Sequence, residues 1–226
     1  MMKKYISVIL AAALMFSAMS CKKQSAGVTR ITYYPTITLE GDAIIIKVGE
    51  SYTDPGFSAS MNGENITDKV TVTDDIDNTT PGIYHIYYST TNEDGISSAA
   101  VRTVFVTNPG HFDNVYLSAC GWNPTPTYRN LPILIEEIQS GIYLIEDLCG
   151  GFYCYGRYPG YEPTYDFHAE GYVTVGADGS LTLIDYDDWY FVGSFDYGNF
   201  SGQYDAATGI VNIDFDGMLV ELTPIS

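Results

Sequence analysis

The sequence predicts an exported all-β protein with two domains. Short β-branched and aromatic runs alternate with Gly, Asn, Asp and Pro, as is typical of strands joined by turns, and no long amphipathic helical pattern interrupts them. The composition changes after residue 110, because 111–226 holds both tryptophans and 13 of the 20 tyrosines. We expect a β-sandwich in 31–108 and an antiparallel β-barrel or two-sheet sandwich in 111–226.

The N-terminus has the pattern of a signal peptide over residues 1–20. Lys3 and Lys4 precede an apolar run, Ile6 to Phe16, that is too short for a transmembrane helix of roughly 20 residues. The following Ala18-Met19-Ser20-Cys21 resembles a lipobox, which implies cleavage before Cys21 and acylation of that residue. An ordinary secretory site ending at Ser20 is the alternative.

Acylation of Cys21 would make the lipid bilayer the first partner of the chain. Each buried methylene contributes about 0.8 kcal/mol, so two or three acyl chains form a stable anchor. Residues 21–30 then serve as a lipidated tether. We expect an outer-membrane lipoprotein of the cell envelope, on either the surface or the periplasmic face.

The chain is strongly acidic, with a formal net charge of −18 at pH 7. Residues 111–226 contain only two basic side chains, Arg129 and Arg157. Nucleic acid binds basic surfaces through its phosphates, so this balance excludes it as a partner.

The first domain shows about seven short strands, the number expected for a small sandwich. Asp54-Pro55-Gly56 and Pro81-Gly82 are turn sequences, and Tyr84, Ile86 and Tyr88 share one face of a strand. The segments VGESYTDPGFSAS, ITDKVTV and TTPGIYHIYYSTTNEDGISSAAVRTVFV resemble the bacterial immunoglobulin-like domains of Bacteroidetes surface lipoproteins. The resemblance covers nearly all of Ile31 to Val106 and implies a spacer or adhesive module. Because this segment lacks Cys, we expect apolar packing alone to hold its core.

The second domain has the turn spacing of an antiparallel meander. Gln139-Ser140-Gly141 and Ala177-Asp178-Gly179 are its clearest hairpin turns. Phe152 to Tyr155 and Trp189 to Phe195 are among the expected strands. The segments GIYLIEDLCGGFYCYGR, GYVTVGADGSLTLI and GQYDAATGIVNI resemble an uncharacterised C-terminal domain that follows Ig-like domains in such lipoproteins. That resemblance covers most of 114–223 and supplies no catalytic residue.

Three cysteines remain once Cys21 is assigned to lipid, namely Cys120, Cys149 and Cys154. A turn at Gly150-Gly151 could join the last two in a disulfide, which export permits. The favoured alternative is that they are small buried apolar residues.

Catalytic and metal patterns are weak. The chain has three histidines and no recognisable nucleophile motif, and its adjacent carboxylates would point to opposite faces of a strand. We therefore expect no enzyme and no catalytic residue. Asp185, Asp187 and Asp188 offer hard oxygen ligands, so a Ca²⁺ site is a hypothesis for this segment.

Aromatic residues give the strongest hint of a ligand surface. Flat rings with polar tips suit sugar rings or a protein partner, although tyrosine is also an ordinary strand former. Of the two tryptophans, Trp189 is the better core candidate. The ligand-binding candidates are Trp122, Tyr155, Tyr158, Tyr161, Tyr165 and Trp189.

These features favour a non-catalytic glycan-binding or accessory protein of carbohydrate uptake, with polysaccharide as its ligand. The alternative is a structural or adhesive envelope protein that binds another protein. An open groove lined by Trp or Tyr would favour glycan, and a flat apolar patch would favour protein.

Overall fold

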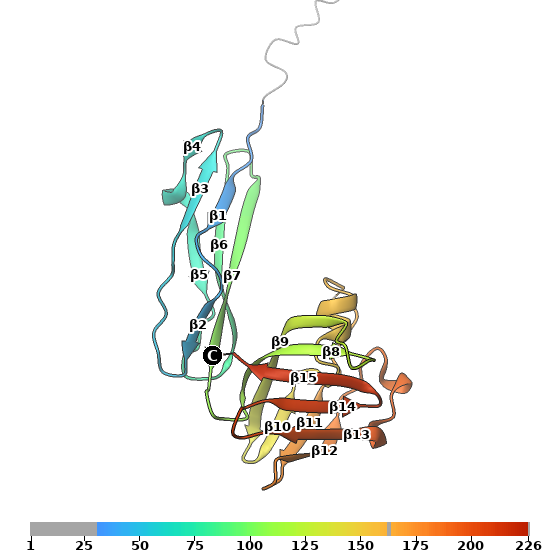
Figure 1. The fold of residues 1–226 in the computed structure, drawn as a ribbon. Coiled ribbons are helices and arrows are strands. Elements are labelled where there is room, and N and C mark those ends of the chain that lie inside the picture. Colours follow the sequence, from blue (N-terminus) through green and yellow to red (C-terminus); the bar gives the residue numbers. More distant parts are fainter. Residues whose placement is uncertain (1–30, 162–163, 226) are drawn as a thin grey trace, which may run out of the picture.

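The computed structural model describes residues 31–161 and 164–225, and nearly all of their regular structure is β-strand (Figure 1). Within these ranges, two facing sheets are followed by a closed barrel, which confirms the all-β prediction and selects the barrel alternative. The predicted signal peptide, Cys21 and tether lie outside the described residues. The helices of the described ranges are all too short or too polar to cross a membrane.

The N-terminal sandwich consists of a sheet in the order β1-β3-β4 and a sheet in the order β2-β7-β6-β5. Strands β2 and β7 run parallel, and the other pairs are antiparallel. A 3-10 turn, Thr67–Lys69, follows β4. The strands are β1 (Thr36–Leu39), β2 (Ile44–Lys47), β3 (Phe57–Met61), β4 (Glu64–Asn65), β5 (Thr71–Asp74), β6 (Gly82–Thr91) and β7 (Ser97–Thr107).

Alternation along the strands builds the sandwich core. On β6, Ile86 and Tyr88 are buried, while Tyr87 between them is 41% exposed. They pack with Val104 and Val106 of β7. The predicted sharing of one face by alternate residues is therefore confirmed at these positions.

The expectation that apolar packing alone holds this core is wrong. Arg102 is 3% exposed, and its Nη2 lies 3.5 Å from Asp54 Oδ1 and donates to Gly56 O at 2.8 Å. The hydroxyl of Tyr88 donates to the other Asp54 oxygen at 2.6 Å. A buried charged network thus fastens the turn at residues 54–56 to strands β6 and β7.

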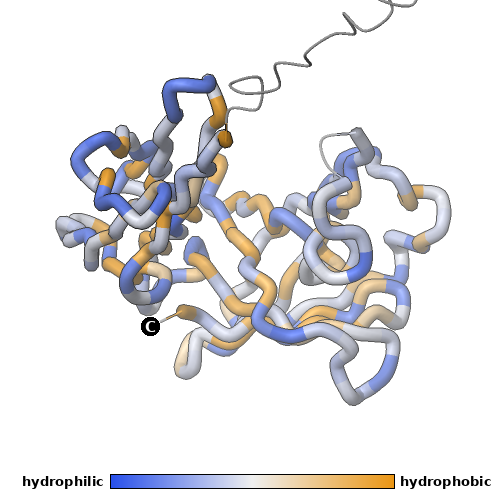
Figure 2. The backbone as a smooth tube through the Cα atoms, turned by 90° about the horizontal axis from the view of Figure 1, so that it is seen from above, coloured by the Kyte–Doolittle hydropathy of each residue, from blue (hydrophilic) through white to orange (hydrophobic). Residues whose placement is uncertain are grey.

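The barrel closes in the order β10-β11-β12-β13-β14-β15-β8-β9, with antiparallel neighbours throughout. Inward residues such as Val211, Ile213 and Phe215 of β14 are buried, and Figure 2 shows apolar and polar segments interspersed along the backbone. The strands are β8 (Asn114–Gly121), β9 (Tyr128–Gln139), β10 (Ile142–Ile145), β11 (Gly171–Val175), β12 (Ser180–Tyr186), β13 (Phe200–Tyr204), β14 (Val211–Phe215) and β15 (Met218–Pro224).

Two predicted strands of the second domain are wrong. Phe152 to Tyr155 belongs to a π-helix, η2 (Phe152–Arg157), which begins after Gly150 and Gly151, both at positive φ. Trp189 to Phe195 is a loop that contains the 3-10 turn η3 (Val192–Ser194), with a second one, η4 (Tyr197–Asn199), after it. In both segments the rings pack over the barrel core instead of alternating between two faces.

Candidate functional site

A groove of about 670 Å³ crosses the outer wall of the barrel, over β13, β14, β15, β8 and the start of β9. Outward side chains of these strands form its floor, and the loop between β8 and β9 forms one side. Both hydrogen-bond donors and acceptors line it. The polar lining residues are Asn123, Arg129, Ser201, Gln203, Asn212, Asp214 and Glu221.

The strand register places five groove residues in one line across the wall. Gln203 pairs with Asn212, Asn212 with Glu221, Glu221 with Ala119, and Ala119 with Arg129. Directly opposite residues of antiparallel strands have Cβ atoms about 4.5–5.5 Å apart. The line, which we call the polar row, therefore presents two amides, a carboxylate and a guanidinium at strand spacing.

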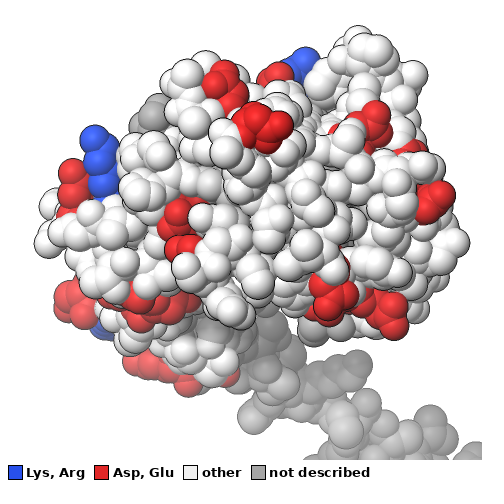
Figure 3. Space-filling view, turned by 90° about the horizontal axis from the view of Figure 1, so that it is seen from below, with Lys and Arg blue, Asp and Glu red and all other residues white. Residues whose placement is uncertain are grey.

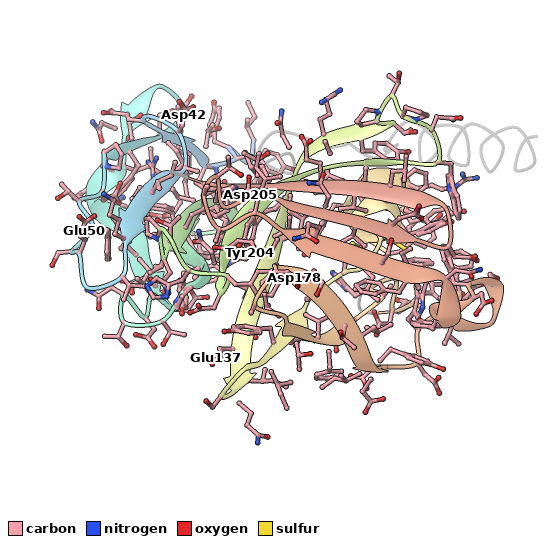
Figure 4. The ribbon with its side chains drawn as sticks, turned by 60° about the horizontal axis from the view of Figure 1, so that its bottom comes forward. Asp42, Glu50, Glu137, Asp178, Tyr204 and Asp205 are labelled. Carbon is pink, nitrogen blue, oxygen red and sulfur yellow. The ribbon has the colours of Figure 1, made fainter. Side chains whose placement is uncertain are left out.

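One end of the polar row is fixed by the neighbouring turn. The Nε2 of Gln203 donates to Asp178 O at 2.7 Å, and Tyr204 N donates to Gly179 O at 2.8 Å. Figure 4 shows Asp178, Tyr204 and Asp205 close to one another, where strand β13 ends. These bonds hold the Gln203 amide in place before any ligand arrives.

The loop beside the groove carries Trp122, which is 45% exposed. Its ring stacks on Phe195, with centroids 5.6 Å apart and an interplanar angle of 26°. The loop folds back on itself, since Thr127 N donates to Cys120 O at 2.8 Å. Trp122 is thus the chain neighbour of Asn123, which lines the groove, and its ring contacts the aromatic side chain of Phe195.

Those aromatic side chains form a layer over the barrel core. Phe195 stacks on the core residue Phe215 at 4.9 Å, and Tyr153 lies 4.8 Å from Phe191 and 5.8 Å from Trp189. We call this set the aromatic layer. Its members are Trp122, Tyr153, Tyr158, Tyr161, Tyr165, Phe167, Trp189, Tyr190, Phe191 and Phe195.

Three tyrosines form the exposed part of this layer, which we call the tyrosine face. Tyr161, Tyr165 and Tyr190 are 55%, 44% and 58% exposed. All three contact the buried Phe167, with ring centroids 6.3, 6.1 and 5.3 Å from it. Phe167 in turn stacks on the half-buried Tyr158 at 5.0 Å.

Trp189 does not belong to a ligand surface. It is 5% exposed, and its Nε1 donates to the Tyr197 hydroxyl at 2.7 Å. Its ring faces are occupied by Tyr153, Phe191 and Phe195, so it is a core residue, and its place among the ligand-binding candidates is corrected.

Tyr155 lies apart from the aromatic layer, in a polar group with Glu146 and His168. Its hydroxyl donates to Glu146 Oε1 at 2.6 Å, and His168 Nε2 lies 3.6 Å from the same oxygen. Glu146 and Tyr155 border a groove of about 460 Å³ that Ile83 and Phe105 of the sandwich complete. Tyr155 therefore faces the junction between sandwich and barrel.

The next residue, Asp147, is fully buried and organises η2. Its carboxylate accepts the backbone N–H groups of Cys149 at 2.8 Å, Gly151 at 2.8 Å and Ala169 at 3.2 Å. Burial raises the pKa of this carboxyl, and the backbone donors oppose that effect. The contacts give Asp147 a structural role in setting the turn before the π-helix.

The three cysteines of the described chain are buried thiols and not disulfides, in agreement with the favoured alternative. Burial raises the pKa of Cys120 to about 11 and that of Cys149 well above its ordinary value. The Sγ of Cys154 lies 3.4 Å from Asp147 Oδ2 and donates to it.

Asp185, Asp187 and Asp188, the residues of the predicted Ca²⁺ site, are not grouped as metal ligands in the structure. Over residues 31–161 and 164–225, no three carboxylates, histidines or cysteines group as metal ligands. Asp185 accepts Tyr186 N at 3.0 Å and Asp187 accepts the Tyr172 hydroxyl at 2.9 Å. The end of β12 is extended, which separates neighbouring side chains.

Sequence patterns alone identify neither the polar row nor Tyr190 as candidate ligand surfaces. Polar residues at alternate positions of β13 to β15 look like any solvated strand face, and only the register aligns them. Tyr190 lay within a predicted strand. No local pattern singles it out, because residues of a loop do not alternate between buried and exposed positions as those of a strand do.

Two family models match the chain. The model for the bacterial surface protein Ig-like domain matches residues 37–106, and the BT2262-like C-terminal domain model matches residues 73–217. The crystal structure of the lipoprotein BT2262 from Bacteroides thetaiotaomicron is 28% identical, with a TM-score of 0.58 over 84% of this chain and 98% of that chain. No curated protein matches.

Two structures of Clostridium perfringens ZmpB are much less similar. One holds its M60 catalytic domain with CBM51-1 and CBM51-2, is 16% identical and covers 82% of this chain and 14% of that chain, with a TM-score of 0.30. The other, CBM51-2 in complex with GlcNAc and INT domains, is 16% identical over 79% and 28%, with a TM-score of 0.28. TM-scores this low do not show a shared fold. The C-terminal domain model spans more than half of the chain, and the protein therefore belongs to the BT2262-like family.

Proposed function

We propose that the protein is a non-catalytic, carbohydrate-binding accessory lipoprotein of the outer membrane, and that the glycan lies in the groove on the barrel wall. The polar row carries the proposal. Sugar hydroxyls both donate and accept hydrogen bonds. The row offers the Asn212 amide, which does both, the Gln203 amide oxygen and the Glu221 carboxylate, which accept, and the Arg129 guanidinium, which donates.

The setting of the row supports a sugar ligand. The groove volume of about 670 Å³ falls in the usual range for ligand sites. Among the described residues no Trp or Tyr lines the groove, but Trp122 belongs to the same loop as the lining residue Asn123 and offers an exposed apolar ring of the kind that suits the C–H face of a sugar.

The N-terminal sandwich acts as a spacer in this proposal. The first described residues, 31–35, lie at the end of the sandwich that is remote from the barrel (Figure 1). A chain anchored through Cys21 would therefore hold the barrel away from the bilayer.

Labelling cells with a palmitate analogue tests the anchor, since the wild-type chain should label and Cys21→Ser should not. Label on Cys21→Ser would contradict it.

Solvent exposure supports binding without catalysis. A glycosidase needs one carboxylic acid whose pKa is raised in a water-poor site. Glu221 is exposed and the groove opens along the wall. We expect no release of product from chromogenic glycosides.

The binding test combines a glycan array with affinity electrophoresis on polysaccharide gels. Asn212→Ala and Glu221→Ala should each weaken retention about tenfold, because each removes a hydrogen-bonding group from the row. Thr223→Ala is the matched control, since Thr223 is another exposed residue of β15 and lies outside the groove lining. Absence of retention on every glycan, or equal retention of the groove variants and the control, would overturn the proposal.

A further inference from the structure

We propose that the tyrosine face docks a Lys- and Arg-rich segment of another protein. This surface is separate from the groove, and it is the exposed part of the aromatic layer. None of its three residues, Tyr161, Tyr165 and Tyr190, lines the groove. The proposal therefore stands or falls independently of carbohydrate binding.

The three rings of the tyrosine face pack on one buried residue. Phe167, 4% exposed, contacts all three rings from below, and the rings of Tyr165 and Tyr190 meet edge to face at 5.3 Å. Tyr190 N donates to Asp166 O at 2.9 Å, which ties the two segments of the face together. Preorganised tyrosines lose little entropy on binding and are frequent hot spots of protein interfaces.

Two exposed carboxylates flank the face along the chain, and one cation, Arg157, lies close to it over the ring of Tyr158. Asp166 follows Tyr165 directly and its side chain is 61% exposed, and Asp188 is exposed two residues before Tyr190. The sequence contains no Lys or Arg after Arg157. Figure 3, which views the molecule from below, shows many carboxylates and few cations on that side of the molecule as well.

These charges select a basic protein partner. Guanidinium and ammonium groups bind over tyrosine rings through cation–π contacts and pair with carboxylates at the rim. Such a contact already occurs among the described residues, where Arg157 lies over the Tyr158 ring at 5.5 Å. A second copy of this acidic chain would instead bring like charges together.

The test measures fluorescence anisotropy of a labelled Lys- and Arg-rich peptide with the purified full-length protein. A Glu-rich peptide of equal length is the negative probe. The triple variant Tyr161→Ala, Tyr165→Ala and Tyr190→Ala should bind the basic peptide at least about tenfold more weakly. Tyr34→Ala is the matched control, because Tyr34 is 68% exposed in the sandwich.

Two double variants test whether the carboxylates beside the face contribute to binding. Asp166→Asn with Asp188→Asn should weaken binding and reduce its salt dependence, whereas Asp42→Asn with Asp68→Asn, at exposed sandwich positions, should not. Equal binding by all variants, or no binding of the basic peptide, would overturn the proposal. A dimer in sedimentation that the triple variant dissociates, or a neutral glycan that displaces the peptide from the face, would also overturn it.

Discussion

The guanidinium of Arg102 lies 3.5 Å from the carboxylate of Asp54 inside the Ig-like sandwich. The Arg102 side chain is 2% exposed and that of Asp54 is 27% exposed. The ion pair joins β7 to the turn at residues 54–56, and the Tyr88 hydroxyl bonds the same carboxylate. A domain without disulfides thus uses a buried charge to fix one of its long loops.

Removing Asp54 should destabilise the sandwich more than removing an exposed carboxylate. Asp54→Ala leaves the buried Arg102 charge without its counterion, which costs about 3 kcal/mol. Urea unfolding followed by far-UV circular dichroism measures the loss. Asp68→Ala, at an exposed position, should change the free energy of unfolding by less than about 0.5 kcal/mol. Equal effects of the two variants would show that the pair contributes nothing specific.

Asp147 should be essential for the π-helix that supports the aromatic layer. Asp147→Ala leaves the buried N–H groups of Cys149, Gly151 and Ala169 without their acceptor, so we expect a loss of about 3 kcal/mol or more. The emission of Trp189, which lies in that layer, should report the loss in a urea titration. A variant as stable as wild type would contradict the structural role of Asp147.

The two tryptophans should differ sharply in solvent access. Trp122 is 45% exposed and Trp189 is 5% exposed. The Trp122→Phe variant, which keeps only Trp189, should emit at shorter wavelength and resist acrylamide quenching. The Trp189→Phe variant should emit at longer wavelength and be quenched readily. The reverse order would contradict the burial of Trp189 in the aromatic layer.

The buried thiol of Cys120 should make stability fall in alkaline solution. Burial raises the pKa of this thiol from 9.0 to about 11, so the folded state favours the neutral form. The resulting stabilisation is complete below pH 9.0 and is lost as the pH rises towards 11. We expect a decrease of about 2–3 kcal/mol in the free energy of unfolding across this range from the thiol.

Comparison with Cys120→Ala isolates that contribution. Half-buried tyrosines such as Tyr197, whose pKa is raised to about 12 by partial burial, lower alkaline stability in the same direction. The variant should therefore keep a weaker pH dependence between pH 9.0 and 11. An unchanged slope would show that the thiol does not ionise on unfolding in this range.

Local sequence patterns predicted the strands whose side chains alternate. One example is β6, where Ile86 and Tyr88 are buried and Tyr87 between them is exposed. Another is the hairpin around residues 177–179. They failed at Phe152 to Tyr155 and Trp189 to Phe195, which have the aromatic composition of strands. There, the buried carboxylate of Asp147 and the packing of rings over the barrel core outweighed intrinsic strand propensity.

The sequence by itself determined the all-β class, the likeness to lipoprotein domains and the acidic charge, because these depend on composition and local periodicity. Only the tertiary structure decided that Arg102 meets Asp54, that Trp189 is core, and that Asn212 and Glu221 align in one groove. Each of these relationships depends on strand register or on loop packing between segments far apart in the chain. Such contacts leave no local pattern, since a strand alternates in the same way whichever residue lies opposite it.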